Sequence, residues 1–463
     1  MAEEKKLFSM PAEKGRWLLI VLGFIINICL GSVYAYGIFG KQLALEWGFG
    51  PDAVTKVQAA GDILKQQIPF GIFLLFFAAV FPLSGQLLEK LGPKKQGIIG
   101  GVIGAMGWIL ASVVARSDTS NVPLFVLAYG VIGGIGVGLC YIAPIQVATR
   151  WFPDRKGLAT GLTVAGFGGS PFISTYLGQK LIDMNGIVDN GRVVAGSGHV
   201  SDALLYLGVA FLVVLLAAFW LMRFPEAGWK PAGWTPKAAS GAVTSAVNYD
   251  RKDIIKTPAF WVLFVCYTIG ALAGLMAIGI YNGVYAKPMI ALTVSTAALS
   301  TAVIVQFILA PFNAAGRPVL GFVTDKVGPR IAAMITFVLI LLAAIGMIMI
   351  KGSDTATTMN RVVYFVCFAA FYAGLGGWLA IAPTATAQYF GTKFSSRNYG
   401  VLFLAYGVGG LIATFVAAYS SKIFKGSGGL LDAFIPIAIL AALGFLLAAL
   451  FMKPPKQVEA PKK

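Results

Sequence analysis

The chain has 463 residues, of which 58% are hydrophobic and only 12% are charged. Soluble domains carry about 25% charged residues, so this composition excludes an ordinary water-soluble protein. The formal net charge is +17, but the basic residues lie in short clusters between apolar runs. That distribution is typical of residues that orient a membrane protein, and we expect no nucleic-acid partner.

Apolar runs long enough to cross a bilayer recur along the whole chain. They predict an all-α membrane protein with twelve transmembrane helices in two pseudo-symmetric bundles of six. The predicted spans are 17–40, 67–89, 96–115, 122–146, 156–179, 203–222, 258–281, 297–323, 330–350, 361–387, 398–420 and 431–452. The lipid bilayer is therefore the first partner that the sequence predicts.

Basic residues are unevenly distributed between the loops of this predicted topology. Twenty-four of the 36 Lys and Arg lie in segments that are cytoplasmic if the N-terminus is cytoplasmic. Membrane proteins keep an excess of Lys and Arg in their cytoplasmic loops. Both termini are therefore expected in the cytoplasm.

A hydrophilic stretch at the midpoint divides the predicted helices into two groups. This stretch contains Pro225, Pro231 and Pro236 and is the longest hydrophilic segment between spans, so we interpret it as a cytoplasmic linker. The expected order is a cytoplasmic tail, a six-helix bundle, the linker, a second six-helix bundle and a second cytoplasmic tail. Their bounds are 1–16, 17–222, 223–257, 258–452 and 453–463.

The two halves contain a repeated segment at equivalent positions. Residues 85–94 follow the second span and residues 321–330 follow the eighth, and both keep two glycines, an acid, a lysine, a proline and a final base in register. Two parallel six-helix repeats are an arrangement used by carriers that move around a central site. The repeated pattern itself resembles the loop signature of the major facilitator superfamily.

Charged residues at these loops are expected to act as gates. Acids at the ends of the second and eighth spans could pair with bases after the fourth and tenth spans, closing the cytoplasmic side in an outward-open state. The alternative is that these charges only fix the topology, because exposed ion pairs contribute about 0–1 kcal/mol. The predicted gating residues are Glu89, Lys90, Asp325, Lys326, Arg155 and Arg397.

Arg317 is the only charged residue between Thr296 and Thr324. Placing an arginine near the bilayer centre costs at least about 2.5–3.5 kcal/mol, so such a residue usually faces a cavity and binds a ligand. Asn313 and Gln306 share its helical face. A guanidinium beside amides suits a carboxylate, and no acid lies deep in any predicted span to neutralise it. The alternative is an arginine that extends to the membrane interface.

Aromatic residues at helical spacing are candidates for the cavity wall. A tyrosine hydroxyl can donate a hydrogen bond to a carboxylate while its ring excludes water. Packing inside the bundle or contact with lipid is the alternative for each of them. The candidates are Tyr34, Tyr141, Trp378, Phe403 and Tyr406.

Four further segments resemble the oxalate/formate antiporter family, a prokaryotic relative of the animal monocarboxylate transporters. The segments are 27–36, 150–161, 316–318 and 396–400. The resemblance implies that Arg317 is the carboxylate-binding arginine, with Tyr34, Tyr141 and Phe403 among the pocket residues. It also implies the cytoplasmic (inner) membrane of a prokaryote as the location.

Two departures from that family narrow the expected substrate. The oxalate carrier has a second basic residue, a lysine, at the position of Tyr406. One buried positive charge suits one negative charge, because a second carboxylate would stay uncompensated. The animal carriers have an aspartate at the position of Asn313, which cannot titrate. A coupled proton would therefore have to arrive with the substrate or through another group.

The sequence thus predicts a secondary active transporter of small monocarboxylates such as lactate, pyruvate, acetate or formate. Alternating access, proton-coupled symport and a monomeric state are expected, with a small organic anion and protons as partners. An oxalate/formate-type exchanger and a non-transporting membrane sensor are the alternatives. We expect no enzyme, because no catalytic His, Asp or Glu lies in a span. We also expect no cofactor and no metal site, since His and Cys are not clustered.

Overall fold

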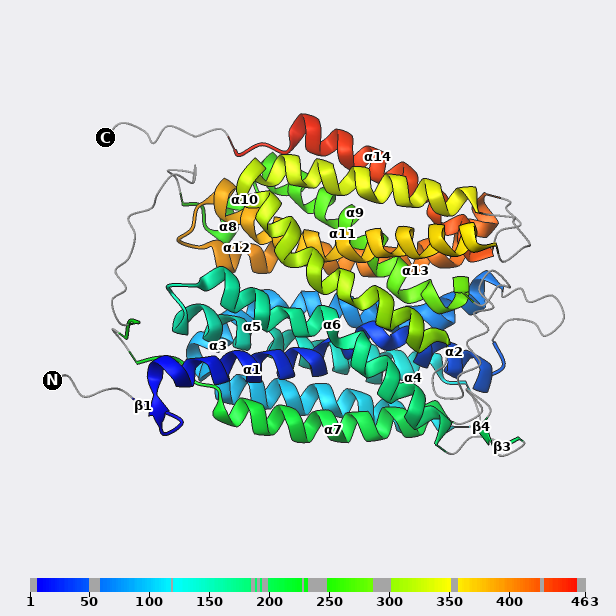
Figure 1. Ribbon diagram of the computed structural model, residues 1–463, viewed down its shortest axis with the longest axis horizontal. Helices are drawn as coiled ribbons and strands as arrows, with labels where there is room; N and C mark the ends of the chain where they lie inside the picture. The colour runs from blue at the N-terminus through cyan, green and yellow to red at the C-terminus, as the bar shows by residue number, and fades with distance from the viewer. Residues whose placement is uncertain are drawn as a thin grey trace.

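The computed structural model describes residues 6–49, 59–117, 120–184, 188–189, 192–193, 199–226, 229–231, 248–285, 301–350, 357–424 and 429–455. Most of these residues are helical, and the long helices run side by side in two layers (Figure 1). Within this part of the chain, nine helices are long and apolar enough to cross a membrane. The predicted all-α membrane fold is therefore confirmed.

The first layer is built by the N-terminal half, drawn in blue to green in Figure 1. Its elements are β1 (Lys6–Leu7), β2 (Met10–Pro11), α1 (Ala12–Leu30), the 3-10 helix η1 (Gly31–Ala35), α2 (Tyr36–Glu46), α3 (Ala60–Ala115), α4 (Val122–Phe125), the π-helix η2 (Val126–Gly133), α5 (Gly134–Trp151), α6 (Lys156–Asp183), β3 (Val188–Asp189), β4 (Arg192–Val193) and α7 (Val200–Leu221). The strands form two short antiparallel pairs, β1 with β2 and β3 with β4.

The second layer is built by the C-terminal half, drawn in green to red. Its elements are α8 (Arg251–Ile254), α9 (Pro258–Tyr285), α10 (Thr301–Met349), α11 (Thr358–Phe390), α12 (Ser395–Leu402), α13 (Leu404–Ile423), the 3-10 helix η4 (Gly429–Ala433) and α14 (Phe434–Phe451). Most of the predicted linker lies outside the described residues. The described end of the linker is hydrogen-bonded to this layer, since Tyr249 donates its backbone N–H to the carbonyl of Phe390.

The longest helix of each half contains a sharp break at a glycine. Gly92 in α3 has φ 74° and ψ 168°, and Gly328 in α10 has φ 82° and ψ 161°. A positive φ costs glycine little because it has no Cβ. Both glycines belong to the repeated segment, so the chain turns back at the same place in both halves. Of the predicted spans, α3 thereby contains two, 67–89 and 96–115, and α10 contains most of two others, 297–323 and 330–350.

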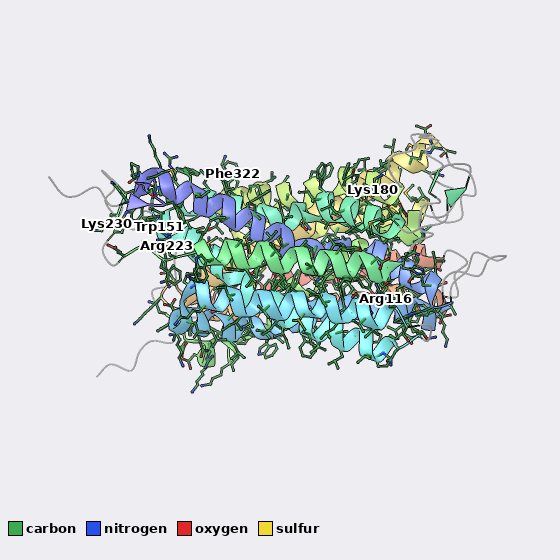
Figure 2. All side chains as sticks on the ribbon, turned by 90° about the horizontal axis from the view of Figure 1, so that it is seen from below. Arg116, Trp151, Lys180, Arg223, Lys230 and Phe322 are labelled. Atoms are coloured by element: carbon green, nitrogen blue, oxygen red, sulfur yellow. The ribbon has the colours of Figure 1, made fainter. Side chains whose placement is uncertain are left out.

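The helices of both layers run between two opposite ends. The termini end is the end at which α1 begins and α14 finishes (Figure 1), and the far end is the opposite one. Figure 2 labels Trp151 and Arg223 at the termini end and Arg116 and Lys180 at the far end. Trp151 donates its indole N–H to the carbonyl of Arg223 at 2.9 Å, which joins α5 to the segment after α7.

Glycines bring α5 close to α3 within the first half. A Cβ added at Gly134 would lie 2.5 Å from the carbonyl oxygen of Phe73, and one at Gly138 would lie 2.7 Å from that of Phe77. Small residues at this four-residue spacing let helices approach closely in a membrane. The contact places the ring of Phe77, a fully buried residue, toward the second half.

The two halves are in tight contact at the far end. Gln67 of α3 donates to the carbonyl oxygen of Gly279 in α9 at 3.1 Å. The ring of Tyr281 packs so closely on Gly37 that a Cβ there would lie 2.6 Å from it. Phe172 of α6 stacks on Phe307 of α10 with ring centroids 4.2 Å apart. These contacts close the far end between the halves.

At the termini end, in contrast, a cleft of about 710 Å³ separates the halves. One wall carries Phe81, Glu89 and Lys90 of α3, and the opposite wall includes Arg251 and Arg397. The ring of Phe81 also packs against Phe403, which lies between α12 and α13, with centroids 4.6 Å apart. This aromatic contact lies at the edge of the cleft, and the residues on its other side are buried inside the protein.

A partly buried ion pair fixes the start of α1 against the loop between α5 and α6. Arg16 donates from both terminal nitrogens to the carboxylate of Asp154, at 2.7 and 3.1 Å, and from one of them to the carbonyl of Trp151 at 3.1 Å. Burial raises the pKa of Asp154, but the hydrogen bonds and charge of Arg16 outweigh it and leave the pKa below its ordinary value. The carboxylate form is therefore favoured in the folded protein.

This pair gives the fold a defined pH dependence. Because the folded pKa of Asp154 is lowered, its stabilisation is present above the unfolded pKa of about 3.9 and is lost as the pH falls through the folded value. We expect Asp154→Asn to lower the melting temperature at pH 7, and the difference from wild type to shrink below about pH 4. Thermal unfolding of both purified proteins between pH 7 and pH 3 checks this. A difference independent of pH would contradict it.

Candidate functional site

Arg317 lies at the contact between the two halves, where α10 of the second packs on α6 of the first. Its side chain is buried, with only 5% of the residue exposed. One terminal nitrogen, Nη1, donates to the carbonyl oxygen of Val164 at 2.8 Å. The ring of Phe167 lies 5.9 Å from the guanidinium carbon. The side chain is thus held inside the protein and does not extend to a membrane interface.

The remaining nitrogens of Arg317 are buried but unpaired. Neither Nε nor Nη2 has a hydrogen-bond partner, and in the described part of the chain no carboxylate forms an ion pair with Arg317. These two nitrogens lie on one edge of the planar guanidinium, an edge that can bind both oxygens of a carboxylate. A buried charge without a partner is costly, so this edge indicates a place for an anion.

Asn313 lies one helical turn from Arg317 and shares its environment. It is 1% exposed, and neither its Nδ2 nor its Oδ1 has a hydrogen-bond partner. Glycines surround it: a Cβ at Gly168 would lie 3.0 Å from the Oδ1, and one at Gly376 would lie 2.2 Å from its backbone oxygen. Side chains larger than hydrogen at these two positions would displace α10. Asn313 therefore adds an unpaired donor and acceptor beside the guanidinium.

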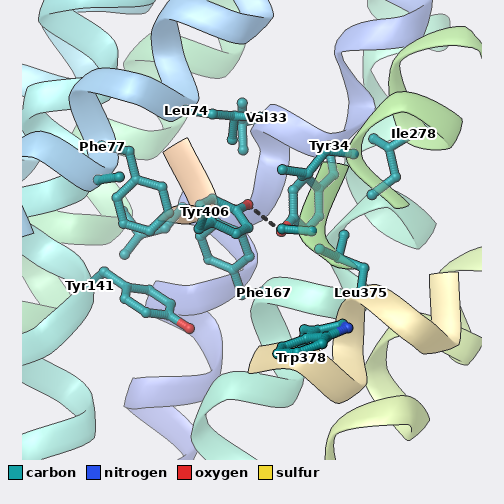
Figure 3. Packing of buried hydrophobic residues seen from close by; sticks show 14 of the residues in the cluster. Val33, Tyr34, Leu74, Phe77, Tyr141, Phe167, Ile278, Leu375, Trp378 and Tyr406 are labelled. Atoms are coloured by element: carbon teal, nitrogen blue, oxygen red, sulfur yellow. Dashed lines mark hydrogen bonds between the residues drawn. The ribbon is translucent and has the colours of Figure 1, made fainter. Parts of the chain in front are cut away.

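Two tyrosines join the halves next to Arg317. The hydroxyls of Tyr34 and Tyr406 are 2.6 Å apart, and Figure 3 shows this bond between η1 and α13. Tyr34 also packs edge-on against Phe167, with centroids 5.1 Å apart. The ring of Phe167 thus contacts both Tyr34 and the guanidinium of Arg317. The structure thus brings together residues from both halves that are 372 positions apart in the sequence.

The ring of Phe77 is the centre of an aromatic cluster around these tyrosines (Figure 3). Its centroid lies 5.3 Å from Tyr141, 5.2 Å from Phe403, 5.9 Å from Tyr406 and 5.8 Å from Phe167. Three of these neighbours, Tyr141, Phe403 and Tyr406, were predicted from the sequence, whereas Phe77 and Phe167 were not. No local signal distinguishes them, because the chain has 33 phenylalanines, most of them in apolar runs.

Trp378 lies on the second-half side of the same region. Its ring stacks on Tyr267 at 5.9 Å and packs against Phe337 at 5.3 Å. It fits because the facing residue, Gly270, has no side chain: a Cβ there would lie 1.9 Å from the indole nitrogen. That nitrogen has no hydrogen-bond partner. Trp378 is therefore packed in the helices of its own half, with one unpaired donor.

Gln306 is separated from the arginine that it was expected to accompany. It precedes Arg317 by eleven residues, about 16 Å along a helix at 1.5 Å per residue. Its Nε2 donates to the hydroxyl of Tyr372 at 3.0 Å. A small acid held by Arg317 does not reach this far. Gln306 therefore belongs to a different polar group.

The predicted gating residues lie at the termini end. Glu89 pairs with Arg150 of α5, a residue of its own half that was not the expected partner. Arg155 lies 3.8 Å from Asp154, and Arg397 is exposed on the cleft wall. The expected ion pairs between the halves would form in a state that is closed at the termini end. In the structure, the cleft lies at that end. Those pairs stay a prediction.

The remaining predicted gating residues are exposed. Lys90 lies on the cleft wall, and Asp325 and Lys326 lie at the break in α10. The amino group of Lys326 is 4.5 Å from the ring of Phe322.

Among the residues that the structure describes, no group of three or more His, Cys, Asp or Glu could hold a metal ion. The chemistry available at the centre is hydrogen bonding and charge, carried by one guanidinium, one amide and several hydroxyls.

Comparisons with known proteins agree with this architecture. The model of the Major Facilitator Superfamily matches residues 16–414. The oxalate:formate antiporter of Oxalobacter formigenes is 25% identical over 435 residues, which cover 94% of this chain and 90% of that protein. Human monocarboxylate transporter 14 is 27% identical over 178 residues, 38% of this chain and 32% of the transporter. Both relationships expected from the sequence motifs are thereby confirmed.

The fold is also found in solved structures. A bacterial homologue of the human lysosomal transporter Spinster, crystallised in an inward-facing and occupied conformation, superposes with a TM-score of 0.66 at 15% identity. The match covers 95% of this chain and 98% of that one. Members of the matching family are transporters and not enzymes, as the sequence predicted. The chain therefore belongs to the Major Facilitator Superfamily and is a multi-pass membrane transporter.

Proposed function

We propose that this transporter carries small monocarboxylates of the lactate, pyruvate, acetate or formate class across the cytoplasmic membrane of a prokaryote. The observation that carries the proposal is the guanidinium of Arg317, which is buried with Nε and Nη2 unpaired. A carboxylate on that edge would gain two charge-assisted hydrogen bonds and neutralise the charge. Both similar proteins, an oxalate:formate antiporter and a monocarboxylate transporter, carry carboxylates according to their names.

The distribution of charge favours one carboxylate over two. Among the residues that the structure describes, Arg317 is the single cation of the central region. Tyr406, which shares a hydrogen bond with Tyr34 beside it, is neutral. A dicarboxylate would bring a second charge into a region lined by aromatic rings. The substrate would lie with its carboxylate on Arg317 and Asn313 and its apolar end against the rings of Tyr34, Tyr141 and Phe403.

Transport would proceed by alternating access. The observed state has the far end closed by contacts between the halves and a cleft at the termini end. Contacts such as Phe81 on Phe403 still separate that cleft from Arg317, so opening toward the termini end requires these rings to part. We propose that the termini end faces the cytoplasm, in line with the excess of basic residues predicted there.

Proton-coupled symport is part of the proposal. Uptake of radiolabelled lactate, acetate, formate and oxalate into proteoliposomes, with and without an inward proton gradient, tests both substrate and coupling. We expect uptake of monocarboxylates to exceed that of oxalate and to increase several-fold with the gradient, because anion and proton would move together. Oxalate counterflow that ignores the gradient would instead favour an oxalate/formate-type exchanger. Absence of flux for every acid would leave a non-transporting sensor.

A further inference from the structure

A second group of buried polar side chains lies outside the Arg317 site. It consists of Thr175, Tyr281, Gln306 and Tyr372, here called the outer cluster. The four residues come from α6, α9, α10 and α11, so the cluster joins both halves. Each of them is 0% exposed. Polar side chains buried this completely are normally hydrogen-bonded.

Most of the polar atoms of the outer cluster lack such partners. Gln306 donates from Nε2 to the hydroxyl of Tyr372, which leaves its Oε1 unpaired. The hydroxyl of Tyr281 lies within hydrogen-bonding reach of Gln306 and Thr175, but these contacts do not have the distance and angle of a full hydrogen bond. Each buried, unpaired polar group costs about 1–3 kcal/mol. Three groups that face one another without a full hydrogen bond indicate a place where a polar ligand can bind between them during transport.

The cluster lies between Arg317 and the far end. Gln306 is eleven residues before Arg317 on α10, toward the end at which that helix begins. Tyr281 packs on Gly37 and is two residues from Gly279, whose carbonyl takes part in the far-end closure. A substrate that enters from the far end must therefore pass the outer cluster before it reaches Arg317.

The outer cluster is uncharged. Gln306 precedes Arg317 by eleven residues, about 16 Å along the helix. The side chains around its amide, those of Tyr281, Tyr372 and Thr175, are neutral. A carboxylate placed here would lose its hydration without meeting a positive charge, and it would face the carbonyl oxygen of Gln306. The cluster is therefore unsuited to the ionised form of an acid.

The undissociated acid fits the unpaired atoms. A protonated carboxyl group has one O–H donor and one carbonyl acceptor. Its O–H can donate to Oε1 of Gln306, and its carbonyl oxygen can accept from the hydroxyls of Tyr281 and Thr175. We propose that the outer cluster is a binding station for the neutral, protonated form of the substrate acid, distinct from the carboxylate site at Arg317.

This inference rests on the proposed function and accounts for its coupling to protons. Asn313 cannot titrate, and in the described spans Arg317 has no carboxylate partner to carry a proton. An acid bound at the outer cluster keeps its O–H bond intact, so the proton enters with the substrate. No titratable side chain is then required at this stage.

Primary amides test the station because they carry a donor and an acceptor but no charge. Binding of formamide, acetamide and lactamide to the purified full-length protein is measured by ligand-detected NMR. At least one amide should bind to wild type and to Arg317→Ala with similar affinity. Gln306→Leu and Tyr281→Phe should each weaken that binding about tenfold, as expected for one lost hydrogen bond. Tyr129→Phe is the matched control, since Tyr129 is equally buried with an unpaired hydroxyl elsewhere.

A second measurement does not depend on the stability of the variants. At pH 8 lactate is almost entirely anionic, so saturating lactate should leave amide binding to wild type unchanged. Displacement of the amide by lactate, loss of amide binding in Arg317→Ala, or no amide binding at all would overturn the station. Failure of the proposed function shows differently, as absent carboxylate flux in proteoliposomes while amide binding and its dependence on Gln306 persist.

Discussion

Replacing Arg317 by alanine is expected to abolish carboxylate transport. The guanidinium offers two unpaired donors on one edge, and hydrogen bonds to charged groups contribute about 1.5–3 kcal/mol each. Their loss should weaken substrate binding by at least about 100-fold, which puts uptake of labelled monocarboxylates at the background of empty liposomes. Arg116→Ala is the control, because that arginine is exposed at the far end and pairs with Asp202. Retained transport in Arg317→Ala would refute the site.

Removing the guanidinium should, in contrast, stabilise the empty protein. In the absence of substrate, Nε and Nη2 of Arg317 are buried without partners, which destabilises the fold. We expect Arg317→Met, which keeps the volume of the side-chain stem, to raise the melting temperature of the empty carrier. Substrate at about 100 times its Kd should stabilise wild type by about 2.7 kcal/mol but leave the variant unchanged. A lower melting temperature for the variant would show that the guanidinium supports the fold.

Tyr406→Lys is expected to shift selectivity from monocarboxylates toward oxalate. Tyr406 is fully buried and hydrogen-bonds Tyr34 beside Arg317, so a lysine there adds a second cation to the same region. A second charge-assisted contact contributes about 1.5–3 kcal/mol, so relative affinity for the dianion should rise by roughly 10- to 150-fold. Oxalate counterflow should become measurable and lactate uptake should fall. Oxalate counterflow and lactate uptake in proteoliposomes measure both changes.

Two control variants distinguish the effect of the added charge on selectivity from the effect of losing the tyrosine. Tyr406→Phe removes only the hydroxyl bond to Tyr34 and should not increase oxalate counterflow. Tyr419→Lys adds a lysine to the same helix, farther toward the far end. If either control gains oxalate counterflow as Tyr406→Lys does, the charge argument for the monocarboxylate preference fails.

Some aspects of the site were predictable because their signals are local in the chain. Arg317 is conspicuous as a lone charge in a long apolar run, and the position of Asn313 follows from helical spacing. Tyr34, Tyr141, Phe403 and Tyr406 were proposed from motifs and helical spacing. In the structure the rings of Tyr141, Phe403 and Tyr406 surround one other ring, and Tyr34 shares a hydrogen bond with Tyr406. That ring, Phe77, could not be predicted from hydrophobic periodicity. Periodicity indicates which face of a helix is buried, but it does not indicate which neighbouring helix packs on that face.

Other features depend on how the helices pack. Gln306 and Arg317 share a helical face, but the approach of α9 and α11 places Gln306 beside Tyr281 and Tyr372 instead. Likewise, Glu89 meets Arg150 because α3 and α5 approach within one half. Loop charges alone could not distinguish this partner from Arg155, since the two arginines lie five residues apart.

The sequence by itself determined the membrane class, the repeated turn at Gly92 and Gly328, and the isolated Arg317. These depend on composition, on the need for glycine at positive φ, and on the cost of a charge in an apolar run. Only the tertiary structure decided which atoms stay unpaired: the open edge of Arg317, the amide of Asn313 and the outer cluster. Hydrogen bonding between helices depends on the rotation of each helix and on the distance between them. Both are set by the packing of side chains that lie far apart in the chain.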